Sequence, residues 1–126
     1  MEKQAKKRKL VKVERISQED AKKILQFIAW DIEELSAWHR DRIEKKLMIL
    51  AEAMGIKIRD FLFPLFIAIA GSSVSTSVID SVAVLGLDIT RARLRHAIAI
   101  LGGVSKKQLK NLEKEYVSLT LKSAQS

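Results

Sequence analysis

Apolar residues recur at intervals of three and four along nearly the whole chain, and glycines at positions 55, 71, 86, 102 and 103 interrupt the pattern. This spacing is typical of helices that bury one face. Glycine readily adopts the left-handed conformation that ends many helices, so we expect a helix to end at each interruption. No run of alternating apolar and polar residues bounded by turns predicts a sheet, although residues 117–121 (VSLTL) are locally β-prone. The sequence therefore predicts an all-α fold, a compact helical bundle or cage of about five to six helices.

Short polar residues before the apolar stretches predict where the helices begin, because their side chains accept hydrogen bonds from free backbone N–H groups. The first helix is expected to bury a stripe that contains Ile24, Leu25, Ile28 and Ile32. Pro64 is expected at or near the first turn of its helix, where a missing N–H costs little. The expected capping residues are Ser17, Ser36, Asp60, Ser75 and Ser105, and Thr90 is expected to start the helix that reaches Leu101.

The length of 126 residues and the hydrophobic content of 48% fit one domain with its own core. The absence of cysteine excludes disulfides, thiolate catalysis and cysteine-based zinc sites. The longest apolar run, Phe61 to Ala70, is shorter than the roughly 20 residues of a membrane-spanning helix. The N-terminus does not read as a secretory signal. We therefore expect a cytoplasmic protein with no membrane partner.

The net charge of +8 is concentrated at the two ends of the chain. Residues 1–15 hold seven Lys or Arg against two Glu, residues 16–85 hold eight basic against ten acidic residues, and residues 86–126 hold eight against three. Basic ends around a nearly neutral middle attract polyanions such as RNA or anionic lipid. Ordinary solubility explains the same charge equally well, so charge alone does not decide the function.

Two adjoining segments carry a resemblance to a known family. They are WHRDRIEKKLMILAEAMGIKIRDF, residues 38–61, and PLFIAIAGSSVSTSVIDSVAVLGLDITRARL, residues 64–94. Together they resemble the C-terminal anticodon-binding region of bacterial glutamyl-tRNA synthetases. That pattern has a tryptophan, an amphipathic helix, Gly-x-Lys, Pro-Leu-Arg-x-Ala-Leu-Thr-Gly, a Ser/Thr-Pro turn, Leu-Gly and a closing Arg-Leu. The resemblance covers roughly residues 30–101.

The resemblance implies an RNA-binding module that positions the anticodon arm of a glutamate-accepting tRNA. The full-length enzyme would be a glutamate-tRNA ligase that uses ATP and Mg²⁺ in protein biosynthesis. The His-Ile-Gly-His-like and Lys-Met-Ser-Lys-Ser-like signatures of its nucleotide-activating domain are absent from this chain. This part is therefore expected to have no catalytic residues and no cofactor, to bind no DNA and to be a monomer.

The resemblance also implies which residues read the anticodon. The Ser/Thr-Pro turn of the family maps onto Ser75, Thr76, Ser77 and Val78, and the arginine of Pro-Leu-Arg maps onto Phe66. The chain departs from the pattern at two of these positions, because Phe66 replaces the arginine and Thr76 replaces the proline. A phenylalanine stacks on an unpaired base or joins the core, but it cannot donate hydrogen bonds to a base edge.

Basic residues near the C-terminal end are candidates for phosphate contacts. Arg91, Arg93 and Arg95 are spaced by two, so a helix spreads them around its axis and at most two can meet the same strand. Arg93 matches the arginine of the closing Arg-Leu, where a structural ion pair and an RNA contact are equally plausible. Lys106 and Lys107 are expected to form a solvated basic edge with long-range, salt-sensitive effects.

Other side chains give weaker signals. The two histidines, His39 and His96, are far apart in the sequence, so no metal site is expected. Trp30 and Trp38 are each either core residues or platforms on which bases stack.

The ends of the chain leave alternatives open. Residues 1–16 are expected to be a basic linker or truncated helix, although an RNA-contacting arm or the remnant of an artificial boundary would look the same. The helical domain is expected at 17–122, followed by a disordered tail at 123–126. The competing functional class is a stand-alone helical protein-interaction domain with basic ends. A membrane-surface module is less favoured, because the most hydrophobic helix lacks a basic face.

Overall fold

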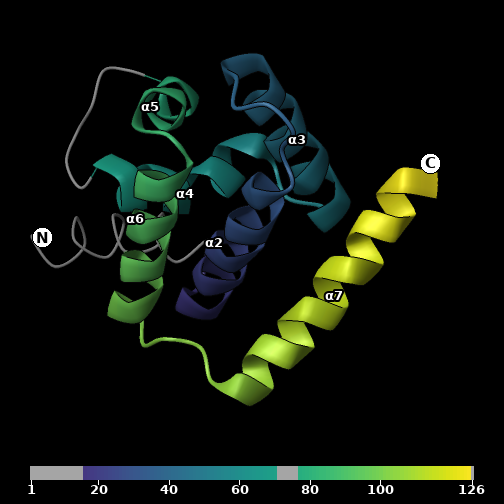
Figure 1. Ribbon diagram of the computed structural model, residues 1–126. Coiled ribbons are helices and arrows are strands. Elements are labelled where there is room, and N and C mark those ends of the chain that lie inside the picture. Colours follow the sequence, from purple (N-terminus) through teal and green to yellow (C-terminus); the bar gives the residue numbers. More distant parts are fainter. Residues whose placement is uncertain (1–15, 71–76, 126) are drawn as a thin grey trace, which may run out of the picture.

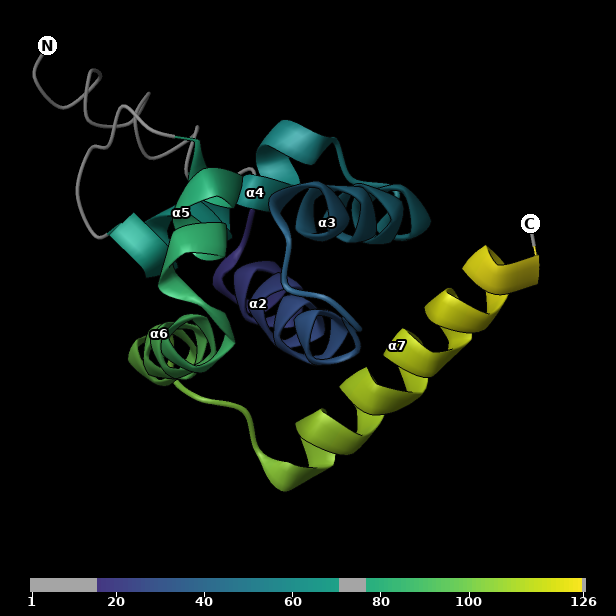
Figure 2. The ribbon, with the colours of Figure 1, turned by 45° about the horizontal axis from the view of Figure 1, so that its top comes forward.

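The structure is a computed structural model that describes residues 16–70 and 77–125 (Figure 1). These residues form six α-helices and no strand, which confirms the predicted fold class. α2 lies in the middle, with α5 and α6 on one side and α7 on the other, and the turned view keeps this order (Figure 2). The helices are α2 (Gln18–Glu33), α3 (Arg40–Met54), α4 (Ile58–Ala70), α5 (Val78–Leu85), α6 (Leu87–Ile100) and α7 (Lys106–Gln125).

The central helix α2 begins as predicted. The hydroxyl of Ser17 accepts a hydrogen bond from the N–H of Asp20 at 3.0 Å. The inward face of the helix packs against α3, α4, α6 and α7. Each large side chain buried there contributes about 2 kcal/mol, so α2 anchors the other helices. The fully buried residues of this face are Ile24, Leu25, Phe27, Ile28 and Ile32.

α3 begins later than predicted. Its first residue is Arg40 and its N-cap is His39, so the prediction of a cap at Ser36 is wrong. The reason is a tertiary contact just before the helix, where the indole N–H of Trp38 donates to the carbonyl of Ala83 at 3.2 Å. This bond fixes the direction of the chain before α3, which local capping chemistry at Ser36 cannot anticipate.

α4 begins earlier than predicted. Its first residue is Ile58, so the predicted cap Asp60 lies in the first turn and Pro64 lies inside the helix. A proline at such a position removes a backbone hydrogen bond and costs about 3 kcal/mol. Burial of Phe61 and Leu65, which have no exposed surface, offsets this cost. Tertiary packing of α4 therefore outweighs the local preference that motivated the prediction.

A single glycine separates α5 from α6. Gly86 has φ 87° and ψ 170°, a conformation that residues with a side chain avoid, and α6 begins immediately afterwards at Leu87. The predicted helix start at Thr90 is therefore wrong, and the Thr90 side chain is fully buried in the core. The predicted cap at Ser75 and the predicted helix end at Gly71 lie outside the described residues.

The turn into α7 uses local signals that the sequence predicted correctly. Gly102 and Gly103 both have positive φ, at 112° and 72°. The hydroxyl of Ser105 accepts from the N–H of Gln108 at 3.1 Å, and the amide oxygen of Gln108 accepts from the N–H of Ser105 at 3.0 Å. This reciprocal pair is a capping box. The buried ammonium of Lys22 also donates to the carbonyl of Gly103 at 3.0 Å, which ties the turn to α2.

Tyr116 is a buried residue of α7 that joins this helix to α2. The hydroxyl of Tyr116 donates to Oδ1 of buried Asp31 at 2.7 Å, and its ring centroid lies 5.5 Å from those of Phe27 and Trp30. Burial raises the pKa of Asp31, although the hydrogen bond from Tyr116 and the charge of Lys46 oppose the rise. Burial and the bond to Asp31 raise the pKa of Tyr116, so its hydroxyl stays protonated and donates.

The raised pKa of Asp31 predicts a pH-dependent contribution to stability. The folded state holds this proton more tightly than the unfolded state, so the contribution is complete below the unfolded pKa of about 3.9. It is lost as the pH rises through the folded pKa. Asparagine can accept the same hydrogen bond and does not ionise. We therefore expect Asp31→Asn to raise the free energy of unfolding at pH 7 relative to the native chain, and to leave it nearly unchanged at pH 3.

Urea unfolding across this pH range measures the difference. Asp88→Asn is the matched control, because Asp88 is exposed and its substitution is not expected to produce the gain. A loss of stability in Asp31→Asn that is equal at every pH would contradict the prediction.

Candidate nucleic-acid interface

One candidate arginine, Arg93, faces the end of α4. Its guanidinium Nη1 donates to the backbone carbonyl of Ile69 in the last turn of that helix. The last carbonyls of a helix lack partners within the helix and carry partial negative charge, so a cation stabilises them. Arg93 therefore has a structural contact, but its partner is a backbone carbonyl and not the acidic side chain of an ion pair. The residue is also exposed, so an additional contact remains sterically open.

α5 packs against α4, and its first residues hold further candidates for RNA contacts. Ser77 is exposed and occupies the N-cap position, but its side chain makes no capping hydrogen bond. Val78 is half-buried against the core, and Phe66 is half-buried on α4. The other two candidates, Ser75 and Thr76, lie outside the described residues. The described part of this predicted site thus places a hydroxyl that makes no capping bond at a helix N-terminus.

Arg91 and Arg95 lie one turn apart on another face of α6, which is directed toward α2. Nε of Arg91 lies 2.8 Å from Oε1 of Glu33, and both side chains are partly exposed. Arg95 is exposed. The three arginines are therefore divided between two faces of α6, as their spacing predicted, and the structure does not bring Arg93 together with the other two.

Arg91 and Arg95 border a groove between α2, α6 and the start of α7, with a volume of about 300 Å³. We call it the arginine groove. Trp30 and Glu33 line its α2 side. The half-buried ring of Trp30 is stacked on Phe27, with centroids 6.2 Å apart and planes inclined by 26°. The groove therefore combines two guanidinium groups, one carboxylate and an indole that the core holds in place.

The predicted basic edge adjoins the arginine groove. Lys106 and Lys107 are exposed in the first turn of α7, and Leu109 in the same turn lines the groove. Exposed ammonium groups in this position raise the local positive potential without forming a fixed pocket.

Sequence reasoning missed the partners that orient these arginines. Glu33 and the carbonyl of Ile69 are distant in sequence from the residues they bind. It also missed the ion pair between Arg40 and Asp80, which connects α3 to α5 and raises the pKa of Arg40. Such pairings have no local sequence signal, because the fold alone decides which side chains meet.

The described residues show neither a metal site nor a helix that could cross a membrane. His39 accepts a hydrogen bond from the N–H of Asp41 at 3.3 Å at the start of α3. Within residues 16–70 and 77–125, no three His, Asp or Glu side chains are grouped in a way that would hold a metal ion. Among the helices that the structure describes, none combines the length and apolar character needed to cross a membrane.

Comparison with known proteins first defines the class. A family model described as an anticodon binding domain matches residues 2–98. This match covers most of the chain, so the chain belongs to the family of anticodon-binding domains, in agreement with the resemblance found in the sequence.

Individual relatives then specify the class further, because they are named glutamate–tRNA ligases. The ligase of Alcanivorax borkumensis is 52% identical over 103 residues, which is 82% of this chain and 21% of the relative. The ligase of Saccharophagus degradans is 52% identical over 102 residues, which is 81% of this chain and 20% of the relative. That of Acinetobacter baumannii strain AYE is 50% identical over 107 residues, or 85% of this chain and 21% of the relative. The chain thus spans about a fifth of the length of these curated relatives.

Proposed function

We propose that the chain is the C-terminal anticodon-binding part of a glutamate–tRNA ligase, which charges tRNA with glutamate using ATP. The identity of about half to proteins of that name, together with the family match over residues 2–98, carries this proposal. In it, the chain selects the tRNA and makes no bond itself. ATP and Mg²⁺ bind in the remainder of the enzyme. The partner is the anticodon arm of a glutamate-accepting tRNA.

The base-reading contacts are assigned to residues 75–78, which run into the start of α5 in the sequence. The proposed residues are Ser75, Thr76, Ser77 and Val78, with Phe66 on the neighbouring helix. The exposed hydroxyl of Ser77, which makes no capping bond to α5, supports this assignment. The first N–H groups of α5 also support it, because such groups at a helix N-terminus donate to acceptors on a ligand.

The phosphate contacts are assigned to the arginine groove and to the adjoining start of α7. Arg95, Lys106 and Lys107 are exposed and are the proposed principal contacts. Arg91 contributes less, since Glu33 already neutralises part of its charge. Arg93 contributes mainly by joining α6 to α4. Phosphate contacts of this kind position the RNA, whereas contacts with base edges provide sequence preference.

A titration against glutamate-accepting tRNA tests the proposal. The same tRNA with each anticodon base changed in turn serves as the matched ligand, and each titration is repeated across a salt series. We expect at least one base change to weaken binding by about tenfold or more, which is the effect of losing one good base contact. Ser77→Ala is then expected to reduce that discrimination.

Two outcomes would contradict parts of the proposal. Binding that depends on salt but not on the anticodon would limit the function to phosphate docking. No binding at low salt, by this chain or by the full-length enzyme, would overturn the tRNA role.

The proposed setting is the cytoplasm, where charged tRNA is used in translation. The proposed state is a monomer, with no role for DNA or a membrane. Sedimentation equilibrium of the chain, with and without tRNA, tests the oligomeric state.

A further inference from the structure

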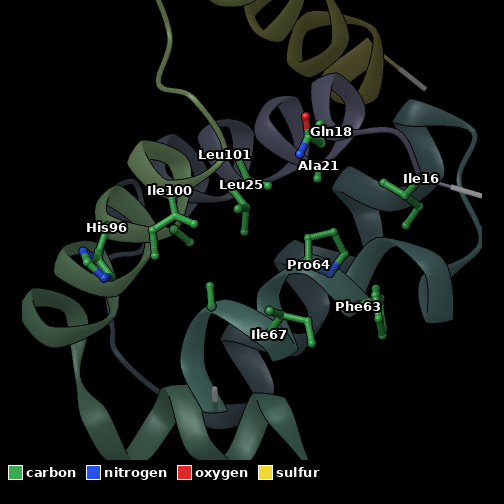
Figure 3. Close-up of a pocket in the computed structure, with 12 residues that line it drawn as sticks. Ile16, Gln18, Ala21, Leu25, Phe63, Pro64, Ile67, His96, Ile100 and Leu101 are labelled. Carbon is green, nitrogen blue, oxygen red and sulfur yellow. The ribbon is translucent and has the colours of Figure 1, made fainter. Parts of the chain in front are cut away.

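An apolar groove crosses the face formed by the start of α2, the middle of α4 and the second half of α6. Its volume is about 530 Å³. We call it the α4–α6 groove. Figure 3 shows Pro64 and Ile67 of α4 on one side and Leu25 and Ile100 on the other. Among the described residues that line this groove, only His96 has an ionisable side chain.

Several large side chains of this groove remain accessible to solvent. The exposed fractions are 43% for Phe63, 53% for Ile67 and 70% for Ile100. Single exposed apolar residues are common, but a hollow lined by several of them marks a surface that is covered by another segment or partner.

The position of the first described residue suggests what covers the groove. Ile16 lines it and packs against the core, so the chain enters α2 along the groove. The preceding residues 10–15 read LVKVER and contain Leu10, Val11 and Val13. At up to about 3.5 Å per residue, a segment of this length reaches roughly 20 Å from Ile16. The apolar side chains therefore lie within reach of the groove.

Apolar and charged residues alternate in this segment, which suits a segment that covers the groove. In an extended chain, Val11 and Val13 point to one side, while Lys12 and Glu14 point to the other. One side is then apolar enough to bury, and the charged side remains in water. The family match begins at residue 2, so this segment belongs to the domain itself.

We propose that residues 10–15 of this chain dock in the α4–α6 groove and bury Val11 and Val13 against Ile67 and Ile100. The segment then completes the hydrophobic core, and it holds the basic cluster at residues 6–9 close to the domain. This inference concerns a face other than the proposed RNA contacts and does not depend on tRNA binding.

Methyl NMR on the full chain tests the docking directly. With labelled isoleucine and valine methyl groups, we expect NOEs from Val11 or Val13 to Ile67 or Ile100, with intensities that do not change on dilution. Absence of these NOEs would overturn the proposal. NOEs found only between differently labelled molecules in a mixed sample would also overturn it, because a second copy would then occupy the groove.

A thermodynamic cycle provides an independent test. Val13→Asp and Ile100→Asp are each expected to lower Tm by about 5 °C, since each removes one buried apolar contact. The double variant is expected to lose no more than the larger single loss, because both changes break the same contact. Val84→Asp is the matched control, since Val84 is 86% exposed and lies on α5 outside the groove.

We expect the control to change Tm by about 1 °C or less. Fully additive losses in the double variant, or losses no greater than that of the control, would overturn the docking. Capture of a different protein by the unsubstituted groove would overturn it too, and would favour a protein-interaction domain instead.

Discussion

Replacement of Tyr116 by alanine is expected to lower the free energy of unfolding by about 4 kcal/mol. The ring of Tyr116 is buried and touches Phe27 and Trp30, so its removal leaves a cavity between α2 and α7. The substitution also removes the hydroxyl that donates to Asp31, whose other carboxylate oxygen has no hydrogen-bond partner among the described residues. Urea unfolding followed by tryptophan fluorescence and by circular dichroism measures the loss.

Two further variants separate the ring from the hydroxyl. Tyr116→Phe keeps the ring, so we expect a loss of about 1–2 kcal/mol, the cost of leaving a buried acceptor without its donor. Val117→Ala is the matched control on the exposed side of α7, and a change within about 0.5 kcal/mol is expected. A loss below 1 kcal/mol for Tyr116→Ala would show that other contacts hold α7 to the domain.

The helix boundaries that the sequence predicted correctly are those set by local chemistry. Ser17 and Ser105 bond to backbone N–H groups three residues away, and Gly55 ends α3 with φ 71°. These interactions involve only neighbouring residues, so the sequence contains all the information needed to predict them.

The boundaries that the sequence predicted wrongly are those set by distant contacts. Trp38 bonds to α5 and fixes the approach to α3, and burial of Phe61 keeps α4 helical through Pro64. Thr90 has a suitable side chain for a cap, but the fold buries it one turn inside α6. Local propensity was overridden in each case by packing between segments far apart in sequence.

The sequence also predicted only part of the candidate site. The motif pattern identified the family, and the spacing of the arginines predicted that they would occupy different faces of α6. The sequence did not predict that Arg91 pairs with Glu33 or that Arg93 binds the carbonyl of Ile69. It also treated Trp30 separately from the arginines, although Trp30, Arg91 and Arg95 border one groove in the fold.

The substitution of Arg95, Lys106 and Lys107 by alanine is expected to weaken tRNA binding by about 100-fold at 0.1 M salt. Each contact with a phosphate of single-stranded RNA contributes about 0.7 to the slope of log K against log salt, so three lost contacts flatten the slope by about 2. Because these side chains are exposed and are not part of the buried core, the stability of the domain is expected to change little.

The matched control removes the same charge elsewhere. Arg42, Lys45 and Lys57 are also exposed but lie on α3 and just before α4. If binding responded only to net charge, both triple variants would weaken it alike and flatten the salt slope equally. A localised interface instead predicts that the control weakens binding by about tenfold or less and keeps most of the slope. Equal effects of the two triple variants would therefore exclude the edge formed by α6 and α7 as the specific RNA-docking surface.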